Sequence, residues 1–311
     1  MSNDDPMANG AGEAISALFR EHKRTFLLLD PFAGEHLQPA IDALTSPPAH
    51  CMRIDDPIFK EAPRSAPLLV ELLSAEQAHH DLLAQSITRA QEEAAHVAGL
   101  RSVCAWLFTD DSLKRLQLSL RQRLDARYPD GERIYLRYFD PRVMPRLADL
   151  LRATTDQPYS NLSQLFGSVR TWCHLNREGQ LQRYDNPRQG NQGFGGYLRF
   201  DENTAASIDR IETINLTARA LLERSIPCKQ SDDGMIDTHL VNAKNLGLQK
   251  SADLVAYVWR AIRYGPAFTR QPGLHELITQ SAVNGIPFDA LIEGGFPSFA
   301  LDVKTLSEST A

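Results

Sequence analysis

The sequence has few cysteines and lacks the short motifs that most often mark an enzyme or a metal site. Four cysteines, Cys51, Cys104, Cys173 and Cys228, occur in 311 residues, and no two of them form a C-x-x-C pair. Such isolated cysteines are typical of reduced, packed thiols rather than of a zinc site or a disulfide framework. The sequence also lacks G-x-S-x-G, Walker, H-E-x-x-H and G-x-G-x-x-G motifs. We therefore expect no catalytic residue, no metal and no cofactor.

A net positive charge and long apolar runs are lacking as well. The formal net charge is −6 and the isoelectric point is about 5.9, which gives no general attraction to nucleic-acid phosphates or anionic lipid. No apolar run approaches the roughly 18 residues of a membrane span. Residues 1–14 are acidic and lack the basic and apolar regions of a secretory signal. We expect a cytoplasmic protein that binds neither nucleic acid nor membranes.

The stretch from 102 to 151 has the clearest local pattern. Ser102–Phe108 is apolar on both alternating faces, as in a central strand, and Thr109–Ser112 is typical of a helix N-terminus. A Tyr-Pro-Asp-Gly turn at 128–131 precedes a predicted strand over 133–140. Asp140-Pro141-Arg142 predicts a capped corner, with the next helix starting near Met144.

Taken in order, the chain predicts an α/β (α+β) N-terminal domain, with a small mixed sheet flanked by helices, and then an all-α domain. Further strands are expected at 25–30, 50–54 and 68–73, and a closing hairpin is expected around 169–185. The Gly-rich stretch PRQGNQGFGG begins at Pro187 and suits a connection. Beyond it, apolar spacing predicts one helix that contains both Ile208 and Leu222, and further helices near 235–246, 253–264, 274–283 and 288–292. The predicted parts are an N-terminal arm with the start of the first helix (1–20), an α/β domain (21–186), a linker (187–200) and a helical domain (201–311).

Three local pairs of reactive residue types favour structural roles. His79 and His80 are adjacent in a predicted helix, where their side chains diverge, so we expect them on the surface rather than on one metal. Cys173 and His174 are adjacent in a predicted strand and point to opposite faces, which disfavours a thiolate–imidazolium pair. Asp232-Asp233 is more simply a helix N-cap than part of a calcium loop.

The group Tyr138, Asp140 and Arg142 has two interpretations. In one, Asp140 caps the corner and forms a salt bridge with Arg142, so the group is purely structural. In the other, it forms a polar and aromatic recognition surface, since Tyr and Arg often anchor protein interfaces. An enzymatic role would need a base or nucleophile beside the group, and none is apparent in the sequence.

Five blocks in a fixed order resemble one known family. The blocks are LLLDPF (27–32), APLLVEL (66–72), CAWLFTDDSLKRLQLSLRQRL (104–124), PDGERIYLRYFDPRVM (129–144) and LFGSVRTW (165–172). This succession is similar to the domain-of-unknown-function family of type VI secretion effector chaperones, also called adaptors. The positions that carry over are Trp106, Arg137, Tyr138, Asp140, Pro141, Arg142 and Trp172.

The resemblance implies a bacterial protein without enzymatic activity. Such adaptors are encoded beside VgrG spike proteins and effectors, and they load a cognate effector onto the spike without being secreted. The expected partners are therefore that effector, through its N-terminal or PAAR-like region, and the VgrG tip. The helical C-terminal part resembles a variable extension, which we expect to help select the cargo. The alternative is a hydrolase-type enzyme with a carboxylate/His site that the fold assembles from Asp140, Cys173 or His174.

Overall fold

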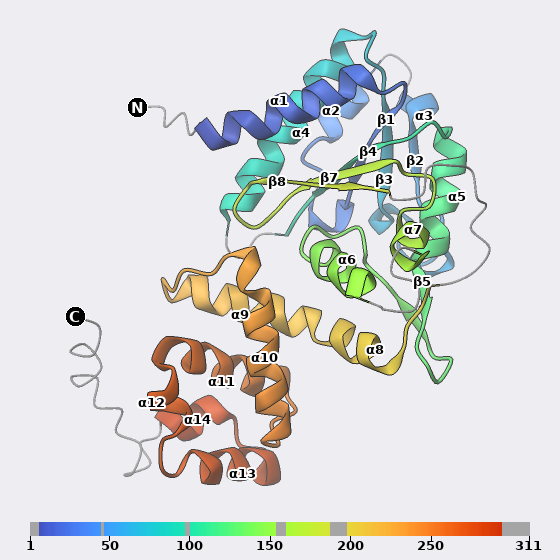
Figure 1. Cartoon of the computed structure of the whole chain (residues 1–311). Helices are drawn as coiled ribbons and strands as arrows, with labels where there is room; N and C mark the ends of the chain where they lie inside the picture. Colours follow the sequence, from blue (N-terminus) through green and yellow to red (C-terminus); the bar gives the residue numbers. More distant parts are fainter. Residues whose placement is uncertain (1–5, 45–46, 97–99, 154–159, 187–197, 294–311) are drawn as a thin grey trace. The chain divides into compact units, whose positions relative to one another are not determined.

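The computed structural model describes residues 6–44, 47–96, 100–153, 160–186 and 198–293 (Figure 1). Residue contacts divide the chain into two compact units, Met1–Ile208 and Asp209–Ala311. The described part of the first unit contains strands and helices, and that of the second contains helices and turns. The predicted fold class, an α/β (α+β) domain followed by a helical domain, is confirmed.

A six-stranded sheet forms the centre of the first unit. Its strand order is β2-β3-β1-β4-β7-β8, and each of these pairings is antiparallel. The strands are β1 (Thr25–Leu29), β2 (Cys51–Arg53), β3 (Leu68–Leu72), β4 (Val103–Phe108), β7 (Thr171–Leu175) and β8 (Leu181–Asp185). The four inner strands are buried along their whole length.

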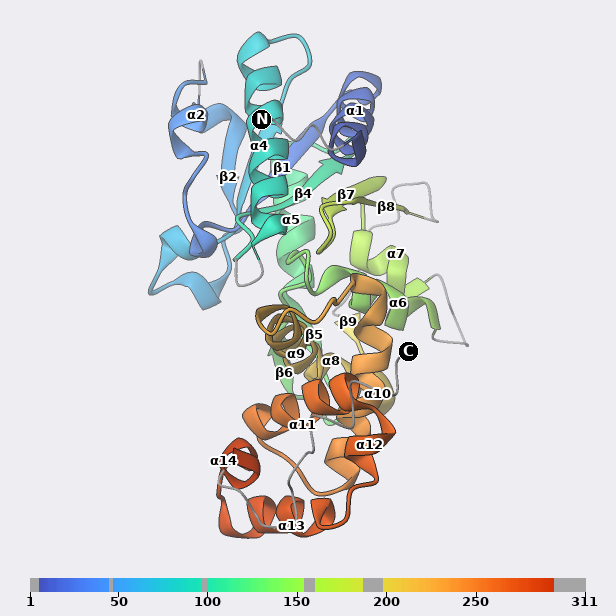
Figure 2. The ribbon, with the colours of Figure 1, turned by 90° about the vertical axis from the view of Figure 1, so that its left-hand side faces the viewer.

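Helices cover both faces of this sheet, and Figures 1 and 2 both show α1 and α4 side by side. The first face is covered by α1 (Pro6–Glu21), α2 (Gln38–Asp42) and α4 (Gln77–Ala95), and the second by α5 (Leu113–Arg123), α6 (Met144–Ala153) and α7 (Ser160–Phe166). A short helix α3 (Pro47–His50) precedes β2. Antiparallel sheets commonly leave one face to solvent, and their strands then alternate apolar and polar residues. Here helices cover both faces of the sheet, which explains why the inner strands are continuous apolar runs.

Side chains alternate between the two apolar cores across the sheet. Leu27, Trp106 and Cys173 are register partners on β1, β4 and β7, and all three lie in the core under α1 and α4. Phe26 and Trp172 lie in the core on the opposite face. The sheet therefore stabilises two separate helical layers through alternate residues of the same strands.

A smaller, mixed sheet follows α5. Strand β5 (Asp125–Arg127) pairs antiparallel with β6 (Arg133–Tyr135) and parallel with β9 (Leu198–Arg199). The predicted turn between β5 and β6 is confirmed, because the Gly131 N–H donates to the Tyr128 carbonyl oxygen at 2.9 Å.

The strand predicted over 133–140 is wrong in its second half. It ends at Tyr135, and residues 136–140 turn inward instead. Leu136, Tyr138 and Phe139 all become buried in the core of the second face. Successive side chains of a strand point to opposite faces, so an extended strand could not place Tyr138 and Phe139 in the same core. The chain therefore leaves the sheet after Tyr135, which the period-2 pattern does not reveal.

A buried arginine closes the junction between α5 and α7. The guanidinium of Arg123 is fully buried and donates hydrogen bonds to the Gln164 carbonyl oxygen (2.6 Å) and to the Ser119 hydroxyl oxygen (2.8 Å). Gly167 follows α7 with φ +56°, and a Cβ atom at this position would collide with that guanidinium. We therefore expect Gly167 to tolerate no side chain.

Gly167→Ala is expected to lower the free energy of unfolding by roughly 2–3 kcal/mol. The alanine would have to adopt a left-handed backbone conformation, and its Cβ atom would clash with the buried Arg123 guanidinium. Urea denaturation measures this. Gly131→Ala is the matched control, because Gly131 also has positive φ (+87°) but has no atom within 4 Å of its Cβ position. Equal losses in the two variants would show that packing on Arg123 is irrelevant.

The second unit is built from α9 (Ile211–Glu223), α10 (Asp233–Asn245), α11 (Ser251–Tyr264), α12 (Pro266–Thr269), α13 (Leu274–Asn284) and α14 (Phe288–Glu293). Its apolar core includes Tyr257, whose ring packs against those of Phe268 and Phe288 at centroid distances of 5.4 and 6.2 Å. The helices predicted near 235–246, 253–264, 274–283 and 288–292 are therefore present.

The junction between the units differs from the simplest expectation. The single helix predicted to contain both Ile208 and Leu222 is two helices, α8 (Glu202–Asp209) and α9, which separate at Arg210. Ile208 packs against the core of the first unit, so α8 belongs to that unit by its contacts. Most of the predicted 187–200 linker lies outside the described residues.

Candidate interaction surface

Three Asp-Pro sequences form the same kind of turn in the first unit. In each, the aspartate carboxylate accepts a hydrogen bond from the backbone N–H two residues later, as in an Asx turn, while proline restricts the φ angle between them. The bonds join Asp30 to Phe32 (3.0 Å), Asp56 to Ile58 (3.0 Å) and Asp140 to Arg142 (2.9 Å). The first two turns open short 3₁₀ helices, η1 (Pro31–Ala33) and η2 (Pro57–Phe59).

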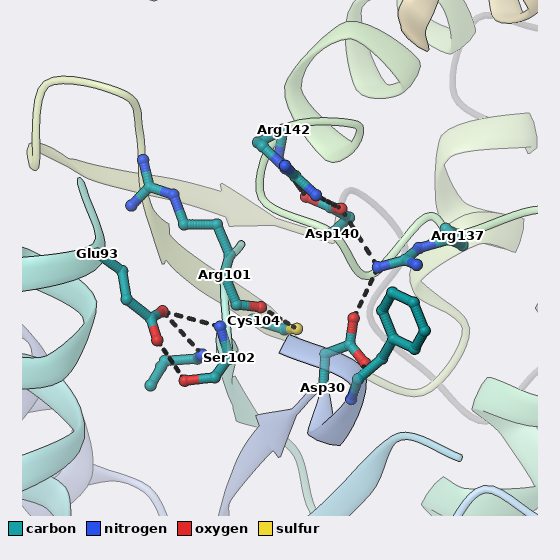
Figure 3. Close-up of polar contacts among 10 residues, drawn as sticks. Asp30, Glu93, Arg101, Ser102, Cys104, Arg137, Asp140 and Arg142 are labelled. Carbon is teal, nitrogen blue, oxygen red and sulfur yellow. Dashed lines mark hydrogen bonds and ion pairs between the residues drawn. The ribbon is translucent and has the colours of Figure 1, made fainter. Parts of the chain in front are cut away.

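Arg137 joins two of these turns (Figure 3). Its Nη2 atom lies 2.6 Å from an Asp30 carboxylate oxygen and 3.5 Å from an Asp140 carboxylate oxygen. Arg142 donates to both oxygens of Asp140, through Nε at 2.9 Å and Nη2 at 2.7 Å. A bidentate pair of this kind fixes orientation as well as distance. The four residues therefore lock the end of β1 to the loop that precedes α6.

The two carboxylates lie inside and the two guanidinium groups reach the surface. The side chains of Asp30 and Asp140 are 4% and 6% exposed, whereas those of Arg137 and Arg142 are 36% and 34% exposed. Burial raises the pKa of Asp30, although Arg137 opposes that shift. Burial alone would also raise the pKa of Asp140, but the hydrogen bonds and charge of Arg142 outweigh it, so this pKa is lowered. Asp140 is thus the ionised anchor of the group.

Two of the three Asp-Pro turns expose a large apolar side chain to solvent. Phe32 is 65% exposed and Ile58 is 53% exposed, although both sit on backbone held by an aspartate. The Arg137 guanidinium lies 6.0 Å from the centre of the Phe32 ring. Helices η1 and η2 both contact a third 3₁₀ helix, η3 (Pro63–Ser65). We call the exposed side chains of Phe32, Ile58, Arg137 and Arg142 the corner surface.

The aromatic residues singled out in the sequence lie beneath this surface or on the other face of the sheet. Tyr138 is fully buried, and its hydroxyl donates to the Leu120 carbonyl oxygen at 3.0 Å. Its ring lies 5.9 Å from that of Trp172, which is also fully buried. Trp106 lies under α4, where its indole N–H donates to the Ser86 hydroxyl oxygen at 2.9 Å. These three residues support the fold and present no side chain to a partner.

The structure brings Arg137, Asp140 and Arg142 together as one ion-pair group, and Trp106 lies apart from them. Asp30 belongs to this group and Phe32 lies beside it, but the sequence reasoning missed both. The repeated Asp-Pro pattern, with an apolar residue next in two of the three turns described above, was the available signal. It predicts the local turn, but not which turns meet.

Cys173 and His174 do not form a catalytic pair in the described structure. As predicted, they point to opposite faces: Cys173 lies in the core under α1 and α4, whereas the His174 ring stacks on Tyr184 at 5.6 Å. Burial raises the pKa of the Cys173 thiol to about 12. Burial, together with nearby Arg101, lowers the pKa of His174 to about 3. The thiol is therefore protonated and the imidazole neutral at physiological pH.

A small pocket lies beside Asp30 at the same end of the sheet. It is lined by Leu29, Pro31, Gly34, Glu35, Leu37, Gln38, Ile41, Leu68 and Ser102. Its lining includes neither Asp140, Cys173 nor His174, the three residues on which a hydrolase site would depend. The pocket is mostly apolar and offers one carboxylate, that of Glu35.

The surface position expected for His79 is wrong. Its ring is fully buried, Nδ1 accepts a hydrogen bond from the Leu73 N–H at 3.2 Å, and burial lowers its pKa. The ring also lies edge-on to His50 at 5.3 Å. On α4, position 79 belongs to the stripe that includes Leu82, Leu83 and Ser86 and faces the sheet, so helical spacing outweighs residue type.

The family model "Domain of unknown function (DUF4123)" matches residues 25–157. That segment covers less than half of the chain and includes all three Asp-Pro turns. No curated protein matches the chain, and neither does any solved structure. Among the described helices, none has both the length and the apolar character needed to cross a membrane. The described residues also contain no group of three or more His, Cys, Asp or Glu side chains suited to a metal ion.

Proposed function

We propose that this chain is a non-enzymatic, cytoplasmic adaptor of a type VI secretion system. It binds one cognate effector, through the effector's N-terminal or PAAR-like region, and helps to load it onto the VgrG spike. The matched family is associated with adaptors of this kind, which supports the proposal at the level of the family. The matched residues also include every member of the corner surface.

The observation that carries the proposal is the rigid presentation of Phe32. A phenylalanine that is 65% exposed loses favourable burial, so its position in a turn held by Asp30 and Arg137 favours a role in binding. Aromatic and arginine side chains dominate the energetics of many interfaces, and the corner surface offers both. Because the turn is already ordered, little conformational entropy is lost when a partner binds.

Phe32→Ser is expected to weaken binding of the full-length chain to the effector encoded beside its gene by at least about tenfold. Isothermal titration with the purified effector measures this. The free energy of unfolding should fall by less than about 1 kcal/mol, because the ring is mostly exposed and makes one distant cation–π contact. Leu216→Ser, a 39%-exposed leucine on α9, is the matched surface control.

Equal affinities for the wild type and Phe32→Ser would remove the corner surface from the proposal. Failure of the wild type to bind that effector at all would reject the adaptor function itself. A turnover activity that disappears in His174→Phe while the chain remains folded would favour the hydrolase alternative instead.

A further inference from the structure

Arg101, which lies just before β4, is a buried cation without a close partner. It is 7% exposed, and its guanidinium forms one hydrogen bond within the described structure, from Nη1 to the Ala90 carbonyl oxygen at 3.5 Å. That distance is at the outer limit for a hydrogen bond. In Figure 3 no dashed line reaches this guanidinium, although Glu93 and Asp140 lie in the same view. Because a buried charge is normally paired, this arrangement lowers the stability of the fold.

The other buried arginines of the described structure are well bonded. Arg123 donates to two oxygen atoms at 2.6 and 2.8 Å, and Arg260 forms an ion pair with Asp289. Arg101 is equally buried but has neither a carboxylate nor a short hydrogen bond among the described residues. Burial alone therefore does not account for its missing partner.

The two carboxylates nearest to Arg101 are already occupied. Glu93 on α4 accepts hydrogen bonds from two backbone N–H groups at the start of β4, at 2.8 and 3.2 Å, and from Arg89 Nε at 2.9 Å. Asp140 accepts two hydrogen bonds from the Arg142 guanidinium. Each carboxylate thus has an arginine of its own, and neither binds Arg101.

The remaining neighbours of Arg101 bring positive charge or none. Because β4 and β7 are antiparallel, the residues before β4 lie at the same end of the sheet as the turn after β7, which contains Arg177. Burial is the main cause that lowers the pKa of Arg101 to about 10, and Glu93 offsets only part of the shift. The charges of Arg142 and Arg177 lower this pKa further. His174, the other nearby titratable group, is neutral at physiological pH.

We propose that Arg101 anchors a carboxylate-binding site and that an acidic side chain of the bound effector fills it. A carboxylate supplies the single negative charge that this guanidinium lacks and can accept two of its N–H groups side by side, whereas a phosphate dianion would bring a second charge. The site adjoins the corner surface, because Arg142, whose charge acts on Arg101, is one of its members and is 34% exposed. This inference rests on the proposed adaptor function and names a chemical group that the effector must carry.

A purely structural role for Arg101 makes the opposite prediction. Ala90 lies in the second half of α4, where a cation is stabilised by the negative end of the helix dipole. If capping α4 were the purpose of Arg101, replacing it would lower stability. If the charge is held for a ligand, an apolar side chain of similar length removes an unpaired buried charge, so stability is unchanged or rises.

Arg101→Met is therefore expected to unfold, without effector, at the same urea concentration as the wild type or at a higher one. Arg123→Met is the matched control, because it removes a buried arginine of the same unit that does have partners, and its unfolding midpoint should fall. A fall of similar size in both variants would show that Arg101 is a structural residue and would overturn the inference.

The second measurement is the affinity of the full-length chain for the purified effector encoded beside its gene. Arg101→Met is expected to raise the dissociation constant at least about tenfold. Each acidic residue in the effector segment that the chain protects from hydrogen exchange is then changed to its amide. One of these changes should weaken binding to the wild type but leave binding to Arg101→Met unaltered, as a double-mutant cycle of a direct pair requires. Additive effects at every acidic residue would reject the pairing.

The outcomes separate this inference from the adaptor proposal. A wild type that does not bind the effector overturns the adaptor function. Binding that is weakened by Phe32→Ser but not by Arg101→Met overturns the present inference alone. Unchanged effector affinity in Arg101→Met, combined with sodium acetate stabilising the wild type but not the variant relative to equal sodium chloride, would assign the site to a free small carboxylate and overturn it as well.

Discussion

Asp140→Ala is expected to lower the free energy of unfolding by about 2–3 kcal/mol, the largest stability loss for any single carboxylate of the corner. The change removes both bonds to the Arg142 guanidinium, the bond from the Arg142 N–H and the weaker pair with Arg137. Removing one partner of a buried pair leaves the other charge without compensation. The loss stays below the upper range for buried pairs because Arg142 and Arg137 are about one-third exposed and can be hydrated.

The pH dependence of this loss has a definite sign. Because the pKa of Asp140 is lowered in the folded chain, its contribution is present at neutral pH and is lost as the pH falls below about 4. Asp140→Ala should therefore lose more stability at pH 7 than near pH 3, as measured by chemical denaturation at both pH values.

Two variants separate the roles of charge and turn geometry. Asp140→Asn keeps an acceptor for the Arg142 N–H but removes the charge, so it should lie between the wild type and Asp140→Ala. Asp149→Ala removes an exposed carboxylate that pairs with exposed Arg152 and should change stability by less than about 0.5 kcal/mol. If Asp140→Ala were as mild as Asp149→Ala, the ion-pair group would not hold the corner.

Loss of Asp140 also bears on binding. The carboxylate orients Arg142 and helps Asp30 to orient Arg137, so its removal releases the Arg142 side chain and weakens the hold on Arg137. We expect effector affinity to fall together with stability in Asp140→Ala. Reduced stability with unchanged affinity would mean that the effector does not use these arginines.

Local structure in this chain followed from local sequence. The TFLLL run forms β1, the Ser112 hydroxyl oxygen accepts from the Arg115 N–H at 3.4 Å as an N-cap, and α6 begins at Met144 as the position of Pro145 predicts. In each case the determinant lies within a few residues of its effect: an apolar run, a side-chain acceptor or the fixed φ of proline.

The candidate site depended instead on contacts between distant segments. Asp30 and Arg137 are 107 residues apart, and they meet because β1 ends beside the loop that precedes α6. No periodicity in either segment specifies that meeting, which follows from strand order. The interpretation of Tyr138, Asp140 and Arg142 was therefore partial: the salt-bridged cap is present, Tyr138 lies inside, and the exposed aromatic is Phe32 from η1, the 3₁₀ helix that follows β1.

His174 should make the folded chain sensitive to mild acid. Its imidazole is 1% exposed, and within the described structure neither ring nitrogen has a hydrogen-bond partner. Burial first, and then nearby Arg101, lower its pKa to about 3, while Asp140 opposes the shift. An unfolded chain would bind a proton on this side chain near its ordinary pKa of about 6.5, so the two states differ in proton uptake between these values.

The sign of the effect follows from which state binds the proton. As the pH falls below about 6.5, the unfolded chain gains a proton that the folded chain does not accept until the pH nears 3. Stability is therefore fully present above about pH 7 and declines by about 1.4 kcal/mol per unit in acid, which amounts to roughly 2 kcal/mol at pH 5. His22, His79 and His239 also have lowered pKa values and add to the same decline.

His174→Phe isolates the contribution of this one imidazole. Phenylalanine keeps a flat ring against Tyr184, and any change in packing affects stability equally at both pH values. Between pH 7 and pH 5, urea denaturation should show the wild type losing roughly 2 kcal/mol more than His174→Phe. A variant that kept the full wild-type decline would show that His174 is protonated in the folded chain, or that the buried neutral imidazole is not what makes the first unit sensitive to acid.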